Sequence, residues 1–265
     1  MKKFIAGGCS FTFGNELSDD DGKTPSRKTW AHRISQFVPG REYVCVAKGG
    51  LGNSAIARKV FDAVHRHGDN VDCVVVMWSF LSRYDWAMPR HKLLDGTRWA
   101  SISPWDTSMS DAERHRELAG SEVQLQEWEI RRQNSTETNV RPFAESIYKY
   151  AANQYHETYL SWKSIIWLQN ILEKKQIPYM FTLADNSLFY QEFKHHKDQD
   201  SFMQALHSEI DLTKWFFFGE RCMGFNQWSI MHDYPRATTH PLDKAHEDAI
   251  MLIQPEFDKI IGGQK

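Results

Sequence analysis

One segment constrains the fold of this chain more than any other. Residues 72–78 read DCVVVMW and are apolar at nearly every position. A strand of that composition has to be covered on both faces, which is typical of a central strand in a parallel sheet with helices on either side. The segment therefore predicts an α/β architecture.

The rest of the chain fits the same plan. Shorter apolar runs at residues 3–7, 42–47 and 178–183 predict three further strands. Apolar residues at helical spacing predict a helix over 29–37, and another over 53–67 that Asn53 would cap. Strands alternating with helices indicate a three-layer α/β/α fold of the flavodoxin-like kind, with a central parallel sheet. Other helical patterns cover 145–175, 190–212 and 245–261, the last kinked near Pro255, while 212–218 fits either a strand or a helix.

Residues 86–140, after the third strand, break this rhythm. We expect one domain over residues 1–265 in which this segment is an insertion, because long excursions of this kind are usually lids or binding loops. Five tryptophans have polar neighbours: Trp86, Trp99, Trp105, Trp128 and Trp162. Such rings either stack on a sugar or a base, or bury a lid or a subunit contact. The sequence leaves the oligomeric state open.

The composition excludes several classes of protein. Lys and Arg total 32 against 34 for Asp and Glu, so the chain lacks the basic excess of a nucleic-acid or acidic-membrane binder. We expect no membrane span and no signal peptide, because the apolar runs are too short. The four cysteines, Cys9, Cys45, Cys73 and Cys222, form no CxxC pair, which favours reduced thiols and a cytoplasmic location.

Two short motifs carry candidate catalytic residues. The turn GCSFTFG at residues 8–14 follows the first strand, and open parallel sheets bind ligands at the edge where their strands end. Ser10 in that turn would lie near backbone N–H groups able to hold an oxyanion. His240 precedes Pro241 just before the last helix, which keeps it in an extended conformation. It could reach Ser10 and act as its general base.

These motifs, with the GGLGNS turn after the second strand, resemble the ordered blocks of the SGNH (GDSL-like) hydrolases. The chain is most similar to the divergent members found in phages and marine bacteria, and a phage-encoded protein would be located in the host cytoplasm. The resemblance covers the first 85 residues and the last 35. It implies that Ser10 is the nucleophile, that His240 is the catalytic histidine, and that Gly52, rather than Gly50, is the oxyanion glycine. His246 would support the loop.

The chain departs from the family in three places. The GDS motif reads Gly8-Cys9-Ser10 and lacks its Asp. The oxyanion Asn after the third strand is also missing, and losing such a donor raises the barrier by about 2.7–4 kcal/mol. Candidate replacements are Ser79, Ser82 and Arg83, with help from Asn53. Arg83 could instead bind an anionic group of the substrate.

The third departure concerns the acid of the catalytic triad. The family places its Asp three residues before the histidine, where this chain has Ala237. The nearest acid upstream is Asp233, which would orient His240 if the loop folds back, and Asp243 follows the histidine. A dyad oriented by a backbone carbonyl is the other possibility, because a triad is defined by geometry and not by spacing.

The sequence thus predicts a serine esterase or acyltransferase for a small or carbohydrate-linked ester, with no cofactor and no metal. One alternative is a catalytically decayed SGNH-fold protein that binds a glycan, a nucleotide or a protein. Another is a flavodoxin-like phosphate binder, although the turn at residues 7–14 lacks a Walker lysine and a GxGxxG pattern. A metal hydrolase is the least favoured, because its candidate ligands do not match a zinc spacing: His195, His196, His232 and Asp233.

Overall fold

The computed structural model describes residues 1–88, 98–107, 140–189 and 201–262. These residues form a sheet of four parallel strands in the order β2-β1-β3-β6. The strands are β1 (Lys2–Gly7), β2 (Arg41–Cys45), β3 (Val71–Trp78) and β6 (Tyr179–Leu183). The predicted α/β fold with a central parallel sheet is confirmed, and β3 lies in the interior of the sheet as its sequence requires.

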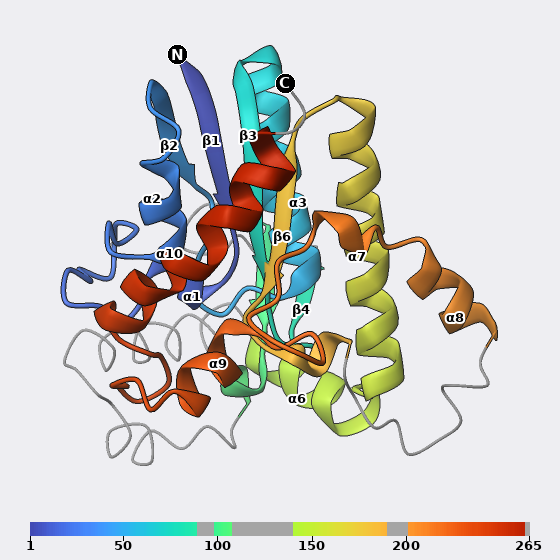
Figure 1. The fold of residues 1–265 in the computed structure, drawn as a ribbon. Coiled ribbons are helices and arrows are strands. Elements are labelled where there is room, and N and C mark those ends of the chain that lie inside the picture. The colour runs from blue at the N-terminus through green and yellow to red at the C-terminus, as the bar shows by residue number, and fades with distance from the viewer. Residues whose placement is uncertain (89–97, 108–139, 190–200, 263–265) are drawn as a thin grey trace.

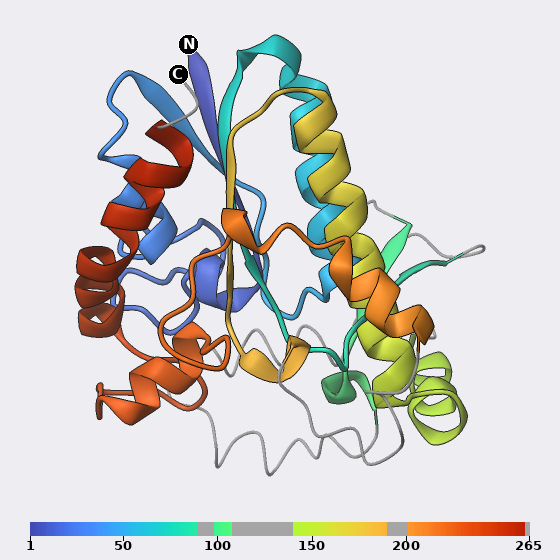
Figure 2. The ribbon, with the colours of Figure 1, turned by 45° about the vertical axis from the view of Figure 1, so that its right-hand side comes forward.

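Helices cover both faces of the sheet (Figures 1 and 2). On one face lie α2 (Trp30–Ser35) and α10 (Asp243–Phe257), and on the other α3 (Asn53–His67) and α7 (Gln154–Lys174). Side chains of β3 alternate between the two layers: Val74, Val76 and Trp78 pack with α3 and α7, whereas Cys73, Val75 and Met77 pack with α2 and α10. This alternation explains why every position from Cys73 to Trp78 is apolar.

The strand ends gather the candidate site at one edge of the sheet. The short helix α1 (Ser10–Phe13) follows β1, whose last residue, Gly7, pairs with Val76 of β3. The turn after β2 lies against the turn that follows α1, since a Cβ atom at Gly49 would be 3.0 Å from Oδ1 of Asn15. The sequence blocks that suggested catalysis are therefore brought to the same edge.

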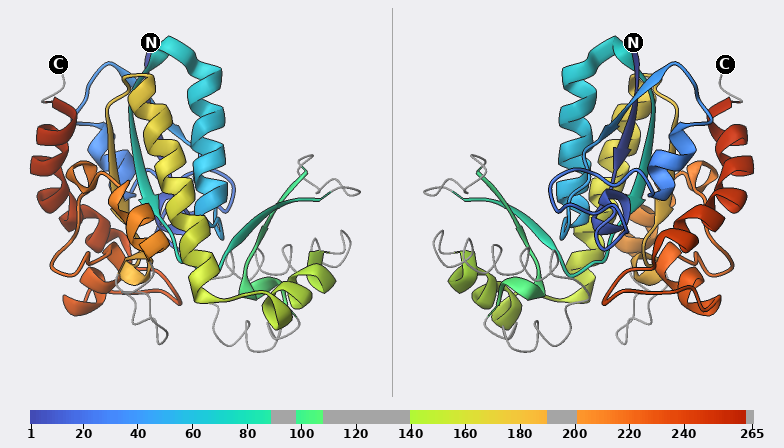
Figure 3. Two further views of the ribbon diagram at one scale, coloured as in Figure 1. Left: turned by 90° about the vertical axis from the view of Figure 1, so that its right-hand side faces the viewer. Right: turned by 90° about the vertical axis from the view of Figure 1, so that its left-hand side faces the viewer.

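The segment after β3 forms an arm of its own. Strands β4 (Tyr84–Ala87) and β5 (Trp99–Ile102) make an antiparallel pair, followed by the 3₁₀ turn η2 (Pro104–Asp106) and by α6 (Val140–Tyr150). The pair projects away from the main sheet (Figure 3) and shares a small apolar core with α6. Arg58 of α3 anchors it by donating to both carboxylate oxygens of Asp85, at 2.7 and 2.9 Å. Residues 89–97 and 108–139, most of the predicted insertion, lie outside the described residues, so its role as a lid stays a prediction.

Several predicted boundaries differ from the structure. The stretch 145–175 is divided between α6 and α7, because Asn153 caps α7 by accepting from the N–H of His156 at 2.9 Å. The N-cap of α3 is Gly52 and not Asn53. Helix α10 continues through Pro255 and ends in a π-helical turn, η6 (Asp258–Gly262). Residues 190–200 of a predicted helix lie outside the described residues, and α8 (Ser201–Ser208) follows them.

The ambiguous segment 212–218 is neither a full strand nor a helix. It begins with the 3₁₀ turn η5 (Leu212–Lys214), and Trp215 then forms a single parallel bridge with Phe181 of β6. The described residues also form two 3₁₀ turns, η1 (Gly68–Asn70) and η3 (Asn186–Leu188), and the helix α9 (Phe225–Met231). Within the described ranges, no helix combines the length and the hydropathy needed to cross a bilayer.

Candidate active site

Ser10 and His240 meet at the edge of the sheet. Nε2 of His240 lies 2.7 Å from Oγ of Ser10. At this hydrogen-bond distance the imidazole can act as the base that takes the hydroxyl proton. Both residues are nearly buried, with exposed fractions of 7% and 9%. The turn that holds Ser10 requires glycine at position 8, where φ is +155° and a Cβ atom would be 2.7 Å from Cβ of Thr12.

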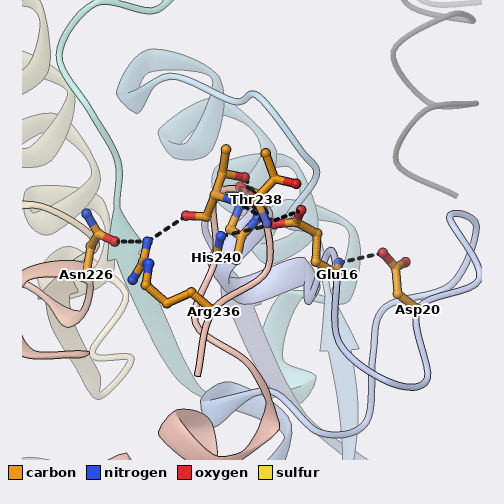
Figure 4. Close-up of polar contacts among 8 residues, drawn as sticks. Glu16, Asp20, Asn226, Arg236, Thr238 and His240 are labelled. Atoms are coloured by element: carbon orange, nitrogen blue, oxygen red, sulfur yellow. Dashed lines mark hydrogen bonds and ion pairs between the residues drawn. The ribbon is translucent and has the colours of Figure 1, made fainter. Parts of the chain in front are cut away.

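A carboxylate contacts the other nitrogen of the same imidazole. Oε2 of Glu16 lies 2.5 Å from Nδ1 of His240. Its oxygens also accept hydrogen bonds from the backbone N–H groups of Thr238, Thr239 and His240 at 3.2, 3.1 and 3.0 Å, and from the Thr239 hydroxyl at 3.1 Å (Figure 4). A continuous series of hydrogen bonds thus runs from Ser10 through the imidazole of His240 to the Glu16 carboxylate. In this arrangement the hydroxyl proton of Ser10 can move from Oγ to Nε2.

The Glu16 carboxylate is held in its ionised form. Burial by itself would raise its pKa above the ordinary 4.5, but the hydrogen bond and charge interaction with His240 outweigh burial, together with the bonds from Thr239. The net effect lowers the pKa. Multiple hydrogen bonds to the charged form of a carboxyl favour that form. An anion is therefore in place beside the imidazole.

The backbone of Glu16 is in a conformation that L-residues rarely adopt. Its φ is +68°, in the left-handed region, and its N–H donates to Oδ2 of Asp20 at 2.7 Å (Figure 4). Such a conformation costs about 1–2 kcal/mol for a residue with a Cβ atom. Strain of this kind persists where the surroundings fix it and is common at functional sites. Since Gly14 and Asn15 both donate to the carbonyl of Ser10, one tight turn supplies the hydroxyl and the carboxylate.

The loop that carries His240 is fixed from two sides. Arg236 and Pro241 form an isolated antiparallel β-bridge, and the N–H of Ala237 donates to the carbonyl of His240 at 3.0 Å. The Arg236 guanidinium donates to Asn226 Oδ1 at 2.9 Å and to the Thr239 carbonyl at 2.9 Å (Figure 4). It also donates to Ser229 Oγ at 3.0 Å. These bonds tie the loop to α9 and leave the imidazole little freedom to move.

The acid on His240 is not the one that the sequence predicted. Asp233 is exposed, and its backbone N–H continues the end of α9 by donating to the carbonyl of Ile230. The geometry places Glu16 at Nδ1 in its stead. Ala237, at the family's Asp position, lies where the loop turns back on His240. A signal was present in the sequence: Glu16 lies in the same short turn as Ser10 and must share its edge of the sheet.

At Gly52, the GGLGNS turn after β2 meets the segment after β3. A Cβ atom there would lie 2.5 Å from the carbonyl oxygen of Arg83 and 2.7 Å from its Cβ, so only glycine fits without movement. The Arg83 guanidinium donates from one nitrogen to the Leu51 carbonyl at 3.2 Å and to Ser79 Oγ at 2.9 Å. It lies over the ring of Phe80, 5.0 Å from the centroid.

Two of the other predicted oxyanion donors, Asn53 and Ser79, are engaged within the scaffold. Asn53 donates both amide hydrogens within the protein, to the Ser79 carbonyl at 3.1 Å and to Ser161 Oγ at 3.0 Å, and it accepts from the Ser79 N–H at 2.7 Å. It therefore braces α3 against β3 and α7 and is not available to a substrate. Ser79 is fully buried. Ser82 contributes its carbonyl to the Tyr148 hydroxyl at 2.7 Å.

Two further predictions concern residues around the site. Nδ1 of His246 accepts from the N–H of Trp30 at 3.2 Å, and burial, aided by the charge of His240, lowers its pKa to about 3. His246 is thus a neutral structural acceptor. Trp162 is a core residue and not part of a platform, since it is 7% exposed and donates to the Leu188 carbonyl.

The metal candidates do not form a site in the part of the chain that the structure describes. His232 and Asp233 lie exposed after α9, and no cluster of three or more metal-ligating side chains occurs among the described residues. His195 and His196 fall outside those residues. The four cysteines are free thiols.

No family model and no curated protein sequence matches this chain. Several solved structures do. They include an acetyl xylan esterase from the rumen bacterium Butyrivibrio proteoclasticus (TM-score 0.43, 11% identity, 98% of this chain and 64% of that one). A GDSL-like lipase from Bacteroides thetaiotaomicron matches with a TM-score of 0.40 and 12% identity over 97% of this chain and 88% of the other. An extracellular lipase from Streptomyces rimosus matches with a TM-score of 0.43 and 10% identity over 98% and 100%.

This chain spans less than two thirds of the length of the acetyl xylan esterase.

Proposed function

We propose that this protein is a serine hydrolase or acyltransferase that acts on acyl esters through Ser10, His240 and Glu16. The observation that carries the proposal is the arrangement around one imidazole, with Ser10 Oγ at 2.7 Å from Nε2 and Glu16 Oε2 at 2.5 Å from Nδ1. This is the geometric criterion for a triad, which is independent of the order or spacing of its members.

The proposed chemistry begins with attack of Ser10 Oγ on the acyl carbonyl carbon, while Nε2 of His240 takes the hydroxyl proton. The carboxylate of Glu16 stabilises the imidazolium that forms. When the tetrahedral intermediate collapses, the bond to the leaving alcohol breaks and Nε2 returns the proton to that oxygen. Water, or the hydroxyl of an acceptor, then attacks the acyl-serine by the same route and releases the acyl group.

The developing oxyanion needs hydrogen-bond donors close to Ser10. Ser10 opens α1, and Gly52 caps α3 with an extended backbone, so their N–H groups are the donors that we propose. Backbone N–H groups arranged in advance cost no reorganisation during the reaction. Because Asn53 and Ser79 are engaged within the scaffold, we assign them no direct contact with the substrate.

A carbohydrate-linked ester is the substrate class that the surface favours. Three tryptophans of the arm after β3 are exposed, with fractions of 48% for Trp86, 40% for Trp99 and 44% for Trp105. Exposed indole rings suit the apolar faces of sugars. As the test, we expect Trp105→Ala to raise the KM for an O-acetylated monosaccharide without changing the KM for p-nitrophenyl acetate. Trp167→Ala, an equally exposed tryptophan on α7, serves as the control.

The primary experiment measures p-nitrophenyl acetate hydrolysis and labelling by a fluorophosphonate probe in the wild type, Ser10→Ala and His240→Ala. We expect the wild type to hydrolyse the ester and to carry the label on Ser10, and both variants to lose the two activities. A wild type that is neither labelled nor active would contradict the proposal. It would favour a decayed fold that binds a ligand without turning it over.

A further inference from the structure

The peptide bond between Leu51 and Gly52 has an unusual partner. Its carbonyl oxygen accepts a hydrogen bond from the guanidinium of Arg83 at 3.2 Å, although 32 positions separate the two residues. Because a trans peptide is planar, its C=O and N–H groups point in opposite directions. Fixing the carbonyl of Leu51 therefore also fixes the direction of the N–H of Gly52.

The surroundings of Arg83 make this contact a rigid one. The same guanidinium nitrogen donates to Ser79 Oγ at 2.9 Å, and Ser79 is fully buried at the end of β3. The backbone of Ser79 is in turn held by the side chain of Asn53 at the start of α3. The position of the guanidinium is thus fixed relative to both β3 and α3, the two elements that meet at the edge of the sheet.

Steric contact at Gly52 also holds this peptide in place. The backbone of Arg83 passes so close that a Cβ atom at position 52 would lie 2.5 Å from its carbonyl oxygen and 2.9 Å from its carbonyl carbon. Residues 51–52 are therefore packed against the main chain of Arg83 and bonded to its side chain. A single residue controls both the position and the rotation of this peptide.

The same residue is also linked to the catalytic imidazole by a series of rings. The Arg83 guanidinium lies over Phe80, and the Phe80 ring is 6.1 Å from the ring of Phe11, the residue after Ser10. Phe11 in turn meets the imidazole of His240 edge-on at 4.7 Å. Arg83 is therefore connected to the catalytic imidazole through Phe80 and Phe11.

We propose that Arg83 is a positioning residue that aims the Gly52 N–H at the oxyanion, in a site that lacks the asparagine donor after the third strand. The inference rests on the proposed function. Arg83 acts through the peptide, since its bonds to Leu51 and Ser79 direct one nitrogen of the guanidinium into the protein. A positive charge on the carbonyl side also polarises the peptide and makes its N–H a stronger donor.

The experiment compares Arg83→Met and Arg83→Lys with the wild type. The measurements are the rate constant for fluorophosphonate labelling of Ser10, kcat and KM for p-nitrophenyl acetate and for the anionic p-nitrophenyl hemisuccinate, and the pH profile of kcat/KM. Labelling is informative because the phosphonyl oxygen takes the position of the oxyanion. The control is Arg58→Met, which releases Asp85 and loosens the arm without contacting residues 51–52.

We expect Arg83→Met to lower kcat and the labelling rate together by about 10²–10³-fold, the range for loss of one oxyanion donor. KM should stay within about threefold for both esters, and the pH profile should keep its shape because the triad is intact. In Arg83→Lys, kcat and the labelling rate should be about tenfold higher than in Arg83→Met, since an ammonium can still donate to the Leu51 carbonyl but forms no planar fork. Arg58→Met should retain wild-type kcat.

Three results would overturn the inference while leaving the proposed function in place. They are labelling of Arg83→Met at the wild-type rate, a rise in KM confined to the anionic ester, and an equal loss in Arg58→Met. The second of these would make Arg83 a binding residue for an anionic substrate. A wild type that is neither labelled nor active would remove the proposed function and this inference together.

Discussion

Oε2 of Glu16 lies 2.5 Å from Nδ1 of His240, although 224 positions separate the two residues in the chain. The carboxylate comes from the turn that carries Ser10 and not from the loop that carries the histidine. The nucleophile and the acid are thus fixed to each other by a few residues, and the histidine is docked onto both. Loss of alignment in the loop at residues 236–241 would affect both hydrogen bonds of the imidazole.

Replacing Glu16 by Gln should abolish most activity. An amide cannot stabilise the imidazolium and also favours the wrong tautomer of the ring, an effect that in a serine protease triad amounts to roughly 10⁴-fold in kcat. We therefore expect a loss of roughly 10³–10⁴-fold for ester hydrolysis. Asp233→Asn makes the same chemical change at the acid that the sequence favoured, and it should keep wild-type kcat. Equal activity of Glu16→Gln and the wild type would contradict the assignment.

Glu16 should also make stability depend on pH in the acidic range. Its pKa in the folded protein lies below the ordinary 4.5, so the unfolded chain binds the proton more readily. The stabilisation is complete above pH 4.5 and is lost as the pH falls through the folded pKa. Urea unfolding between pH 7 and pH 3 should show that the free energy of unfolding decreases less with falling pH in Glu16→Gln than in the wild type. Parallel curves would contradict the prediction.

The sequence could predict the sheet because the apolar pattern of β3 admits few other environments. It could also predict Ser10 as a candidate, since the residue follows the first strand, and the family resemblance indicated His240, which lies in the loop between α9 and α10. The place of Glu16 in the turn of Ser10 indicated a shared edge of the sheet, but the sequence could not predict its contact with His240. The contact depends on a left-handed backbone at Glu16 and on a return of the loop at Ala237, and neither leaves a pattern in the chain.

The oxyanion candidates show a second limit of sequence reasoning. Asn53 has the right chemistry and the right place in the chain, but its amide is committed to Ser79 and Ser161. Hydrogen-bond capacity is finite, and a buried amide satisfied within the scaffold has none left for a ligand. Which polar side chain is committed depends on packing between α3, β3 and α7, and the sequence does not specify those distances.

Gly52→Ala should damage both stability and catalysis. The new methyl group would meet the carbonyl oxygen of Arg83 at 2.5 Å, and a backbone atom cannot rotate away. We expect a loss of about 1–3 kcal/mol in the free energy of unfolding, the range for overpacking, with a fall in kcat as the Gly52 N–H moves. Gly262→Ala is the matched control, because a Cβ atom there has no neighbour within 4 Å. A fully active, fully stable Gly52→Ala would exclude a tight contact.

Arg236→Lys should loosen the histidine loop without removing its charge. The guanidinium bonds three oxygens, on Asn226, Ser229 and Thr239, whereas an ammonium in the same place cannot reach all three in the same geometry. Loss of one such charged hydrogen bond costs about 1.5–3 kcal/mol. We expect a decrease of that size in the free energy of unfolding and a lower kcat. Lys244→Arg, on the exposed start of α10, should change neither quantity.

His246 should govern stability at mildly acidic pH. Its pKa in the folded protein is about 3, chiefly because the ring is buried, whereas the ordinary value is 6.5. The folded state therefore stays neutral at this residue while the unfolded chain takes up a proton. The stability that this neutral ring confers is complete above pH 6.5 and decreases below it, with a slope of about 1.4 kcal/mol per pH unit for one proton. His246→Asn keeps an acceptor for the N–H of Trp30 but does not titrate, so urea unfolding between pH 6.5 and 4.5 should show a shallower slope by about that amount. Identical slopes would mean that the ring is protonated in the folded protein, and the bond to Trp30 would then have to be lost at low pH.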